Sequence, residues 1–282
     1  LESPDGQRTY GELAGDAHQV ANLFRSLGAS SGDAVGVLAD NGNTLIECSL
    51  AAQESGLHFI PLNTHLTAHE LAAIMEHSGA KVLVIGERFA NLLDGLDAKA
   101  LGLTVVAVGS IQDVTSLADA RANLPRTPPS DRRPGGLFVY TSGTTGKPKG
   151  IRRAIPDGDV GQVANDAALF GRAFDFRPFE GPMLVSTGMF HGGSHSYYMG
   201  GLNVGHALVI MPKFDPERAL QLIEQYRVTT GYMVPTQFHR LLQLPQETRG
   251  RYDVSSLHAI VHSAAPCPRP VKEQMMAWWG PV

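Results

Sequence analysis

Short apolar runs alternate along the chain with segments whose apolar residues recur at helical spacing. After Thr9, for example, apolar side chains return every three or four positions from Leu13 to Leu27, which predicts a helix buried along one face. The runs are continuously apolar, which is typical of strands buried on both faces of a mostly parallel sheet. In the first third of the chain they span residues 34–38, 57–61, 82–85 and 103–108.

The starts and ends of these helices are marked by polar residues and glycine. A Thr-x-x-Glu spacing predicts a capping box, in which each side chain satisfies a free amide at a helix start. A following glycine predicts the stop, since glycine adopts the left-handed conformation of a helix end. Three such pairs of start and stop are Thr9–Glu12 with Gly28, Thr44–Glu47 with Gly56, and Thr67–Glu70 with Gly79.

A connector rich in proline and arginine, residues 124–136, interrupts this alternation. Such a composition favours an irregular segment, so we expect a first αβ subdomain over residues 1–134 and a second over 135–282. The second half again alternates, and Asp215 followed by Pro216 predicts a helix start. Its expected strands are 137–140, 183–187, 207–211, 229–234 and 259–263. The predicted fold class is α/β.

Composition narrows the function. Hydrophobic residues make up 43% of the 282 residues, and the formal net charge is −4, which argues against a nucleic-acid partner. No apolar run approaches the roughly 18 residues of a membrane span. The two cysteines, Cys48 and Cys267, predict no disulfide framework and fit a cytoplasmic location. Leu1 is not an initiator methionine, so we expect the numbering to begin inside a longer chain.

Residues 140–150, Tyr-Thr-Ser-Gly-Thr-Thr-Gly-Lys-Pro-Lys-Gly, follow an expected strand and are rich in glycine, hydroxyl groups and lysine. Glycines let backbone amides turn toward an anion, while hydroxyls and lysines add hydrogen bonds and charge. The stretch therefore predicts a phosphate-binding loop. It is not a Walker loop, because only two residues separate Gly143 from Gly146, and Pro148 stands where a magnesium-binding hydroxyl is needed.

This string resembles the signature of the adenylate-forming enzymes, which include acyl-CoA synthetases, luciferases and adenylation domains of peptide synthetases. The resemblance implies attack of a carboxylate on the α-phosphate of ATP, then transfer of the acyl group to a thiol, usually that of coenzyme A. It implies the N-terminal region of that fold. It also implies Mg²⁺ with ATP, Thr144 as the metal-side residue, Lys149 as a catalytic residue, and the following phosphate contacts: Thr141, Ser142, Gly143, Thr144, Thr145, Gly146 and Lys149.

Further segments resemble the same family. Met189-Phe190-His191-Gly192 is similar to a signature in which the histidine lies near the reacting carboxylate, although Gly188 replaces the usual proline; the resemblance implies His191 as a second catalytic residue. A structural histidine is the alternative. Residues 261–268 resemble the loop that packs against adenine, with Ser263, Ala264, Ala265 and Pro266 as nucleotide contacts. We expect the phosphate loop, His191 and Ser263 to converge on one cleft, because α/β sheets bind ligands at the carboxyl ends of their strands.

The resemblance places the acid-binding pocket after His191 and around residues 231–236. The expected lining is His191, Gly192, Tyr197, Gly231, Val234 and Thr236. Glycines between residues 192 and 205 would leave open volume, or they belong to a tightly packed helix; the sequence favours neither. No acidic residue there suits an amino-acid substrate, so a fatty or other hydrophobic acid is expected, with aromatic and sterol-derived acids as alternatives.

The family's later signatures do not occur before Val282, so we expect a fragment that lacks the C-terminal domain and is inactive alone. The implied partners are a small carboxylic acid, ATP and CoA, and a homodimer is left open. The rival interpretations are a non-catalytic nucleotide-binding module, a phosphotransferase, and a serine hydrolase suggested by His191-Gly192-Gly193-Ser194. The hydrolase interpretation needs a Gly-x-Ser-x-Gly elbow downstream of His191, and none occurs there.

Overall fold

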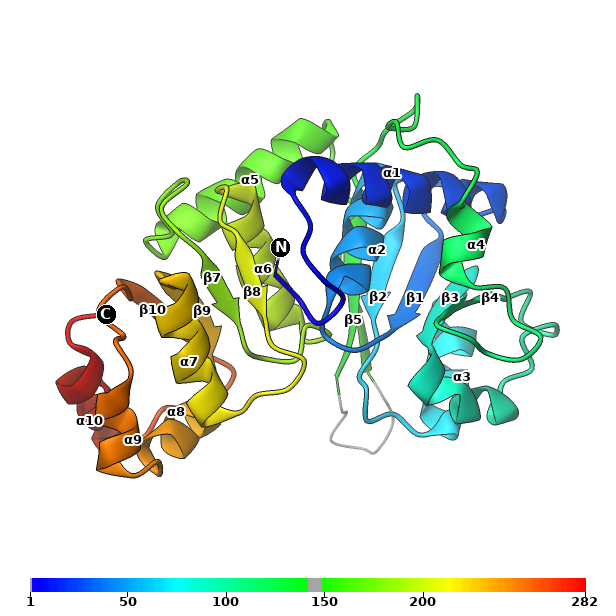
Figure 1. Cartoon of the computed structure of the whole chain (residues 1–282). Coiled ribbons are helices and arrows are strands. Elements are labelled where there is room, and N and C mark those ends of the chain that lie inside the picture. Colours follow the sequence, from blue (N-terminus) through cyan, green and yellow to red (C-terminus); the bar gives the residue numbers. More distant parts are fainter. Residues whose placement is uncertain (1, 142–148) are drawn as a thin grey trace. The chain divides into compact units, whose positions relative to one another are not determined.

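The computed structural model describes residues 2–141 and 149–282, which divide into two compact units. We call Arg8–Val163 the N-terminal unit and Ala164–Val282, together with residues 2–7, the C-terminal unit. Each unit contains a mostly parallel sheet with flanking helices (Figure 1), which confirms the predicted α/β class.

The N-terminal unit is built on a six-stranded sheet in the order β4-β3-β1-β2-β5-β6. All pairs are parallel except β5 with β6. The strands are β1 (Ala34–Leu38), β2 (His58–Pro61), β3 (Val82–Gly86), β4 (Thr104–Val108), β5 (Gly136–Thr141) and β6 (Lys149–Arg152). The helices are α1 (Tyr10–Ser26), α2 (Asn43–Glu54), α3 (Ala68–Ser78), α4 (Leu117–Arg121) and the 3-10 helix η1 (Glu87–Gly95).

Alternate residues of the strands face opposite layers. Leu38, Leu83 and Ile85 join a cluster with Leu71 and Ile74 of α3. Successive strand side chains point to opposite faces, so the residues between them face the other side, where α1 and α2 pack against each other. Every residue of β1 is buried, which explains why the run reads as continuously apolar rather than alternating.

The C-terminal unit has a four-stranded parallel sheet in the order β10-β9-β7-β8. Helices α7, α8 and α10 contribute to one apolar cluster on it, and α6 packs against β7, β8 and β9. The strands are β7 (Met183–Val185), β8 (Leu208–Ile210), β9 (Thr230–Met233) and β10 (Ala259–His262). The helices are α5 (Val160–Ala173), α6 (Gly192–Asn203), α7 (Pro216–Tyr226), α8 (Pro235–Leu242), α9 (Gln246–Arg251) and α10 (Arg269–Trp279).

The helix starts test the capping predictions. Thr9 and Thr67 each form the predicted box, and Asp215 accepts a hydrogen bond from the Arg218 amide at 2.8 Å. The prediction at Thr44 is wrong, because α2 starts at Asn43 and has Gly42 as its N-cap. The carboxylate of Glu47 instead accepts a hydrogen bond from Arg121 at 2.7 Å. It is therefore committed to a buried ion pair and not to its own helix start.

The proline- and arginine-rich connector is bound along α1. Side-chain amides of Gln19 and Asn22 donate to the carbonyls of Leu124 and Pro125, each at 3.0 Å. The Arg126 guanidinium donates to Asp16 at 2.7 Å. We call residues 122–135 the strap. The strap leads into β5, which pairs with β2, so residues 136–152 continue the first sheet. The chain passes from one unit to the other at residues 163–164, whereas the expected boundary was at 134.

Both cysteines are free thiols; Cys48 is buried and Cys267 partly buried. Burial raises the pKa of the Cys48 thiol, so it stays a neutral apolar group. Across residues 2–141 and 149–282, no helix combines the length and the hydropathy that spanning a membrane requires.

Candidate functional site

The two described ends of the predicted phosphate loop are the facing ends of a β-hairpin. Thr141 on β5 pairs with Lys149 on β6, and the Thr141 hydroxyl lies 3.5 Å from the Lys149 carbonyl oxygen, to which it donates. Both residues are exposed. The other predicted phosphate contacts, Ser142, Gly143, Thr144, Thr145 and Gly146, lie outside the described residues.

An aromatic pair supports the base of this hairpin. The rings of Phe138 and Tyr140 stack with centroids 4.9 Å apart, and the Tyr140 hydroxyl lies 2.7 Å from Nδ1 of His77. Burial raises the pKa of Tyr140 to about 12, so the phenol keeps its proton at neutral pH. On β6, a Cβ at Gly150 would lie 2.7 Å from the Phe138 ring and 3.0 Å from the Tyr140 ring. Only glycine fits there without displacement, which accounts for the last glycine of the string.

In the C-terminal unit, two predicted residues, Tyr197 and Ser263, meet through Tyr232 at the carboxyl ends of β9 and β10. Tyr232 directly follows Gly231 on β9, and its hydroxyl lies 3.0 Å from Oγ of Ser263, the first residue after β10. Its ring stacks on Tyr197 of α6, with centroids 4.4 Å apart and planes within 12°. We call Tyr197, Tyr232 and Ser263 the strand-end cluster. Tyr232 was not predicted as a site residue, because an aromatic residue within an apolar run looks the same in the sequence as any other buried strand residue.

The start of α6 approaches the same cluster. A Cβ at Gly193 would lie 3.1 Å from the Tyr232 hydroxyl, so the missing side chain allows the close approach. His191 is the N-cap residue of α6 and is exposed, and its backbone carbonyl accepts from the His195 amide at 2.8 Å. Its ring centroid lies 4.3 Å from that of Phe190. Gly192 is the first residue of the helix. The glycines of residues 192–203 thus belong to a helix.

The loop after β10 has a strained backbone. Ala264 has φ of 71°, a left-handed conformation that a non-glycine residue rarely adopts. Ala264, Ala265 and Pro266 are exposed, and α10 starts three residues later at Arg269. Strain of this kind costs about 1–3 kcal/mol and is concentrated at ligand-binding segments, so it agrees with the predicted adenine-side loop without testing it.

The remaining predicted pocket residues lie at the start of α8. Val234 is the N-cap, and its amide donates to the Gln237 side-chain oxygen at 3.0 Å. The Gln237 amide in turn donates to the Ser186 carbonyl at 2.9 Å. This bridge ties α8 to the end of β7 and was not predicted. Thr236 is exposed on the first turn, and no contact joins it to the strand-end cluster among the described residues.

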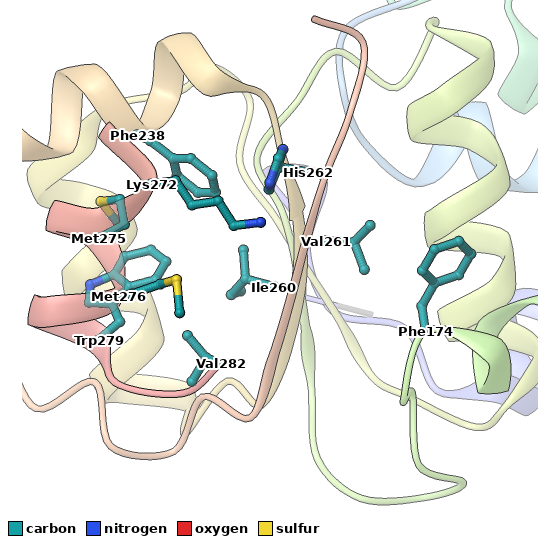
Figure 2. Close-up of a pocket in the computed structure, with 10 residues that line it drawn as sticks. All are labelled: Phe174, Phe238, Ile260, Val261, His262, Lys272, Met275, Met276, Trp279 and Val282. Carbon is teal, nitrogen blue, oxygen red and sulfur yellow. The ribbon is translucent and has the colours of Figure 1, made fainter. Parts of the chain in front are cut away.

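A cavity of about 460 Å³ lies between β10 and α10 (Figure 2). Figure 2 shows the Lys272 side chain extending toward Ile260 and His262, while Phe174 and Val261 lie on the other side of β10. Burial and the Lys272 charge lower the pKa of His262, so the imidazole is neutral at pH 7. The lining residues are Phe174, Phe238, Ile260, Val261, His262, Lys272, Met275, Met276, Trp279 and Val282.

The predicted site residues are thus divided between the units. Thr141 and Lys149 belong to the N-terminal unit, whereas His191, Tyr197 and Ser263 belong to the C-terminal unit. Their convergence on one cleft stays a prediction. Among residues 2–141 and 149–282, no group of three or more histidine, cysteine, aspartate or glutamate residues is arranged to hold a metal ion. Thr144, the residue predicted at the metal, is outside those ranges.

Comparison with known proteins agrees with this architecture. FadD13 of Mycobacterium tuberculosis strain H37Rv, a long-chain-fatty-acid–CoA ligase, is 29% identical over 272 residues, covering 94% of this chain and 52% of the relative. Indoleacetate–CoA ligase of Aromatoleum aromaticum is 28% identical over 267 residues, covering 92% of this chain and 51% of the relative. The chain thus spans about half the length of these relatives.

The solved structure of the anthranilate CoA ligase AuaEII in complex with anthranoyl-AMP superposes with a TM-score of 0.86. At 23% identity it covers 99% of this chain and 54% of its own chain, and this likeness shows the shared fold. The model of the AMP-binding enzyme family matches residues 2–282. The chain therefore belongs to the AMP-binding enzyme family, the adenylate-forming group that its glycine- and threonine-rich string resembles.

Proposed function

We propose that the protein containing this chain activates a carboxylic acid with ATP and transfers the acyl group to coenzyme A. The observation that carries this proposal is the family match over residues 2–282. The two relatives named above are CoA ligases of a fatty acid and of an aromatic acid. The proposed substrates are therefore fatty or other hydrophobic acids, and amino acids are the less favoured alternative.

The proposed reaction has two balanced steps. A carboxylate oxygen forms a bond to the α-phosphorus of ATP while the bond to pyrophosphate breaks, which gives an acyl-adenylate. A thiolate sulfur then bonds to the acyl carbon, and AMP leaves with the bonding electrons. Charge accumulates on the departing pyrophosphate, so preorganised donors and cations beside it lower the barrier.

Thr141 and Lys149, at the paired ends of the hairpin, are proposed to contact the phosphates of ATP. Mg²⁺ is proposed to bind together with ATP. The exposed Lys149 has no ion pair among the described residues, and its ammonium is therefore available to an anion. His191 is proposed to orient the carboxylate, and residues 263–266 to contact the adenine. The predicted cytoplasmic location is kept as part of the proposal, since ATP and CoA are supplied there.

The test is ATP–pyrophosphate exchange against fatty, aromatic, sterol-derived and amino acids, using the protein that contains this chain. Acid-dependent exchange is expected, with AMP as the product once CoA is added. The Lys149→Ala variant should lower exchange by roughly 10- to 100-fold, because a charge-assisted contact to the leaving group is lost. Lys99→Ala is the matched control, since Lys99 is also exposed but lies in the loop before β4.

Each alternative gives its own result. Formation of ADP in place of AMP would indicate a phosphotransferase. ATP binding without exchange for any acid would indicate a nucleotide-binding module. Ester hydrolysis without ATP would indicate a hydrolase. Unchanged exchange in Lys149→Ala would remove that residue from the mechanism.

A further inference from the structure

A continuous aromatic surface leads from the exposed side of α5 to the strand-end cluster. Phe170, which is 37% exposed, lies on α5 with its ring centroid 5.3 Å from that of Tyr197. Phe174 lies 5.1 Å from Tyr197 in an edge-to-face arrangement at 70°. Tyr197 then stacks on Tyr232, which is 4% exposed. The rings therefore extend from solvent to the interior.

The inner end of this surface is polar. The hydroxyls of Tyr232 and Ser263 lie 3.0 Å apart, and each can donate or accept. Burial raises the pKa of Tyr197, with the neighbouring Tyr232 as a second cause, so its phenol also keeps its proton. Gly193 at the start of α6 lies close to the Tyr232 hydroxyl, since a Cβ added there would be 3.1 Å from it.

These two features suit different parts of a ligand. Aromatic rings prefer offset-stacked or edge-to-face partners, which the ring surface offers to a flat π system. The partly buried hydroxyl pair discriminates against a ligand that cannot hydrogen-bond to it, because the donor and acceptor positions that the two hydroxyls do not use on each other lose water without gaining a partner. A long alkyl chain would place methylenes against that pair. A compact aromatic acid with a polar ring substituent would satisfy it.

We propose that the stacked Tyr197–Tyr232 pair and the Tyr232–Ser263 hydroxyl pair select an aromatic carboxylic acid that carries a hydroxyl or amino substituent, over a long-chain fatty acid. This inference rests on the proposed function, because it names the substrate class of the same acid-activating site. It assigns Tyr232 and Ser263 as specificity-determining residues, the Ser263 hydroxyl in addition to the adenine contact proposed above for residues 263–266. Neither has a role in bond formation here.

The experiment compares kcat/KM for pyrophosphate exchange with matched acids. The panel pairs 4-hydroxycinnamate with cinnamate and 4-aminobenzoate with benzoate, and adds decanoate and palmitate. The substituted acid of at least one pair should exceed both its unsubstituted partner and the fatty acids by about tenfold or more. Tyr232→Phe and Ser263→Ala should each reduce that ratio toward one, because each removes one side of the hydroxyl pair.

Tyr252→Phe is the matched control: Tyr252 donates to Glu217 at 2.7 Å, away from the cluster, and its loss should leave the ratio unchanged. Thermal melting of every variant separates misfolding from altered selectivity, and Ser263→Ala serves if Tyr232→Phe fails to fold. Exchange with palmitate above all aromatic acids would overturn the inference and leave the proposed function standing. No exchange with any acid would overturn both.

Discussion

At the scale of single residues, the firmest structural constraint on the predicted phosphate loop is a missing side chain. Gly150 faces two stacked rings at distances that no ordinary Cβ contact reaches. The glycine of the string is therefore required by packing beneath the hairpin, in addition to any contact with an anion. The motif thus encodes both the loop and the surface that supports it.

Gly150→Ala should accordingly destabilise the N-terminal unit. Overpacking against Phe138 and Tyr140 costs about 1–3 kcal/mol, which should lower the urea midpoint of unfolding. Gly250→Ala on α9 is the control, because nothing lies within 4 Å of an added Cβ there, and alanine is the better helix former. An unchanged midpoint for Gly150→Ala would mean that the rings move aside without cost.

At the scale of elements, sequence patterns predicted strands well and helix starts only in part. The continuous apolar runs became buried parallel strands because both faces of each sheet are covered. The Thr-x-x-Glu pattern failed at Thr44, since the pattern is local whereas Arg121, the partner of Glu47, lies 74 positions away. No local signal distinguishes a glutamate that caps its helix from one that binds a distant guanidinium.

The same motif therefore provides a matched test. Thr67→Ala removes a hydroxyl that accepts from the Glu70 amide at 3.3 Å, and should cost about 1 kcal/mol of folding free energy. Thr44→Ala removes the same atoms from the second residue of α2, where no cap is formed, and should cost clearly less. Chemical denaturation of both variants measures the difference; equal losses would contradict the assigned helix starts.

At the scale of the whole molecule, three partly or fully buried histidines link stability to pH. Burial lowers the pKa of His58, His206 and His262, whereas the unfolded imidazole has a pKa of about 6.5. Between the folded and unfolded pKa values, the unfolded chain binds more protons, so protonation favours unfolding. Stability from these groups is present above about pH 6.5 and falls as the pH drops below it.

Urea midpoints measured from about pH 7.5 down to about pH 5 should therefore decrease. His206→Gln should flatten that decrease, because His206 is fully buried between the Arg177 carbonyl and Thr230. Hydrogen bonds from Ser255, and to a smaller extent Arg227, lower the pKa of Asp253 to about 2. Asp253 therefore changes stability only at more acidic pH. A variant with the same pH slope as the parent would exclude His206 as a contributor.

The candidate site was predictable in its residue types but not in its contacts. Tyr197, Gly231 and Ser263 were predicted from separate segments, and the structure brings Tyr197 and Ser263 together through Tyr232, the neighbour of Gly231. Tyr232 was missed because buried strands are commonly aromatic. Composition marked the connector, whereas strand pairing decides which sheet the following residues join, and β5 and β6 join the first sheet.

The strap has a consequence for proteolysis. Arginine-rich connectors are ordinarily the segments that trypsin cuts, since trypsin binds its substrate as an extended, exposed strand. Here Arg126 and Arg132 are bound to Asp16 and Glu54, and the carbonyls of Leu124, Pro125 and Arg126 are held by α1 side chains. Cleavage at these arginines would require the strap to detach from both α1 and α2, because Asp16 lies on α1 and Glu54 on α2. Trypsin should therefore digest this arginine-rich segment only at the rate at which α1 and α2 release it.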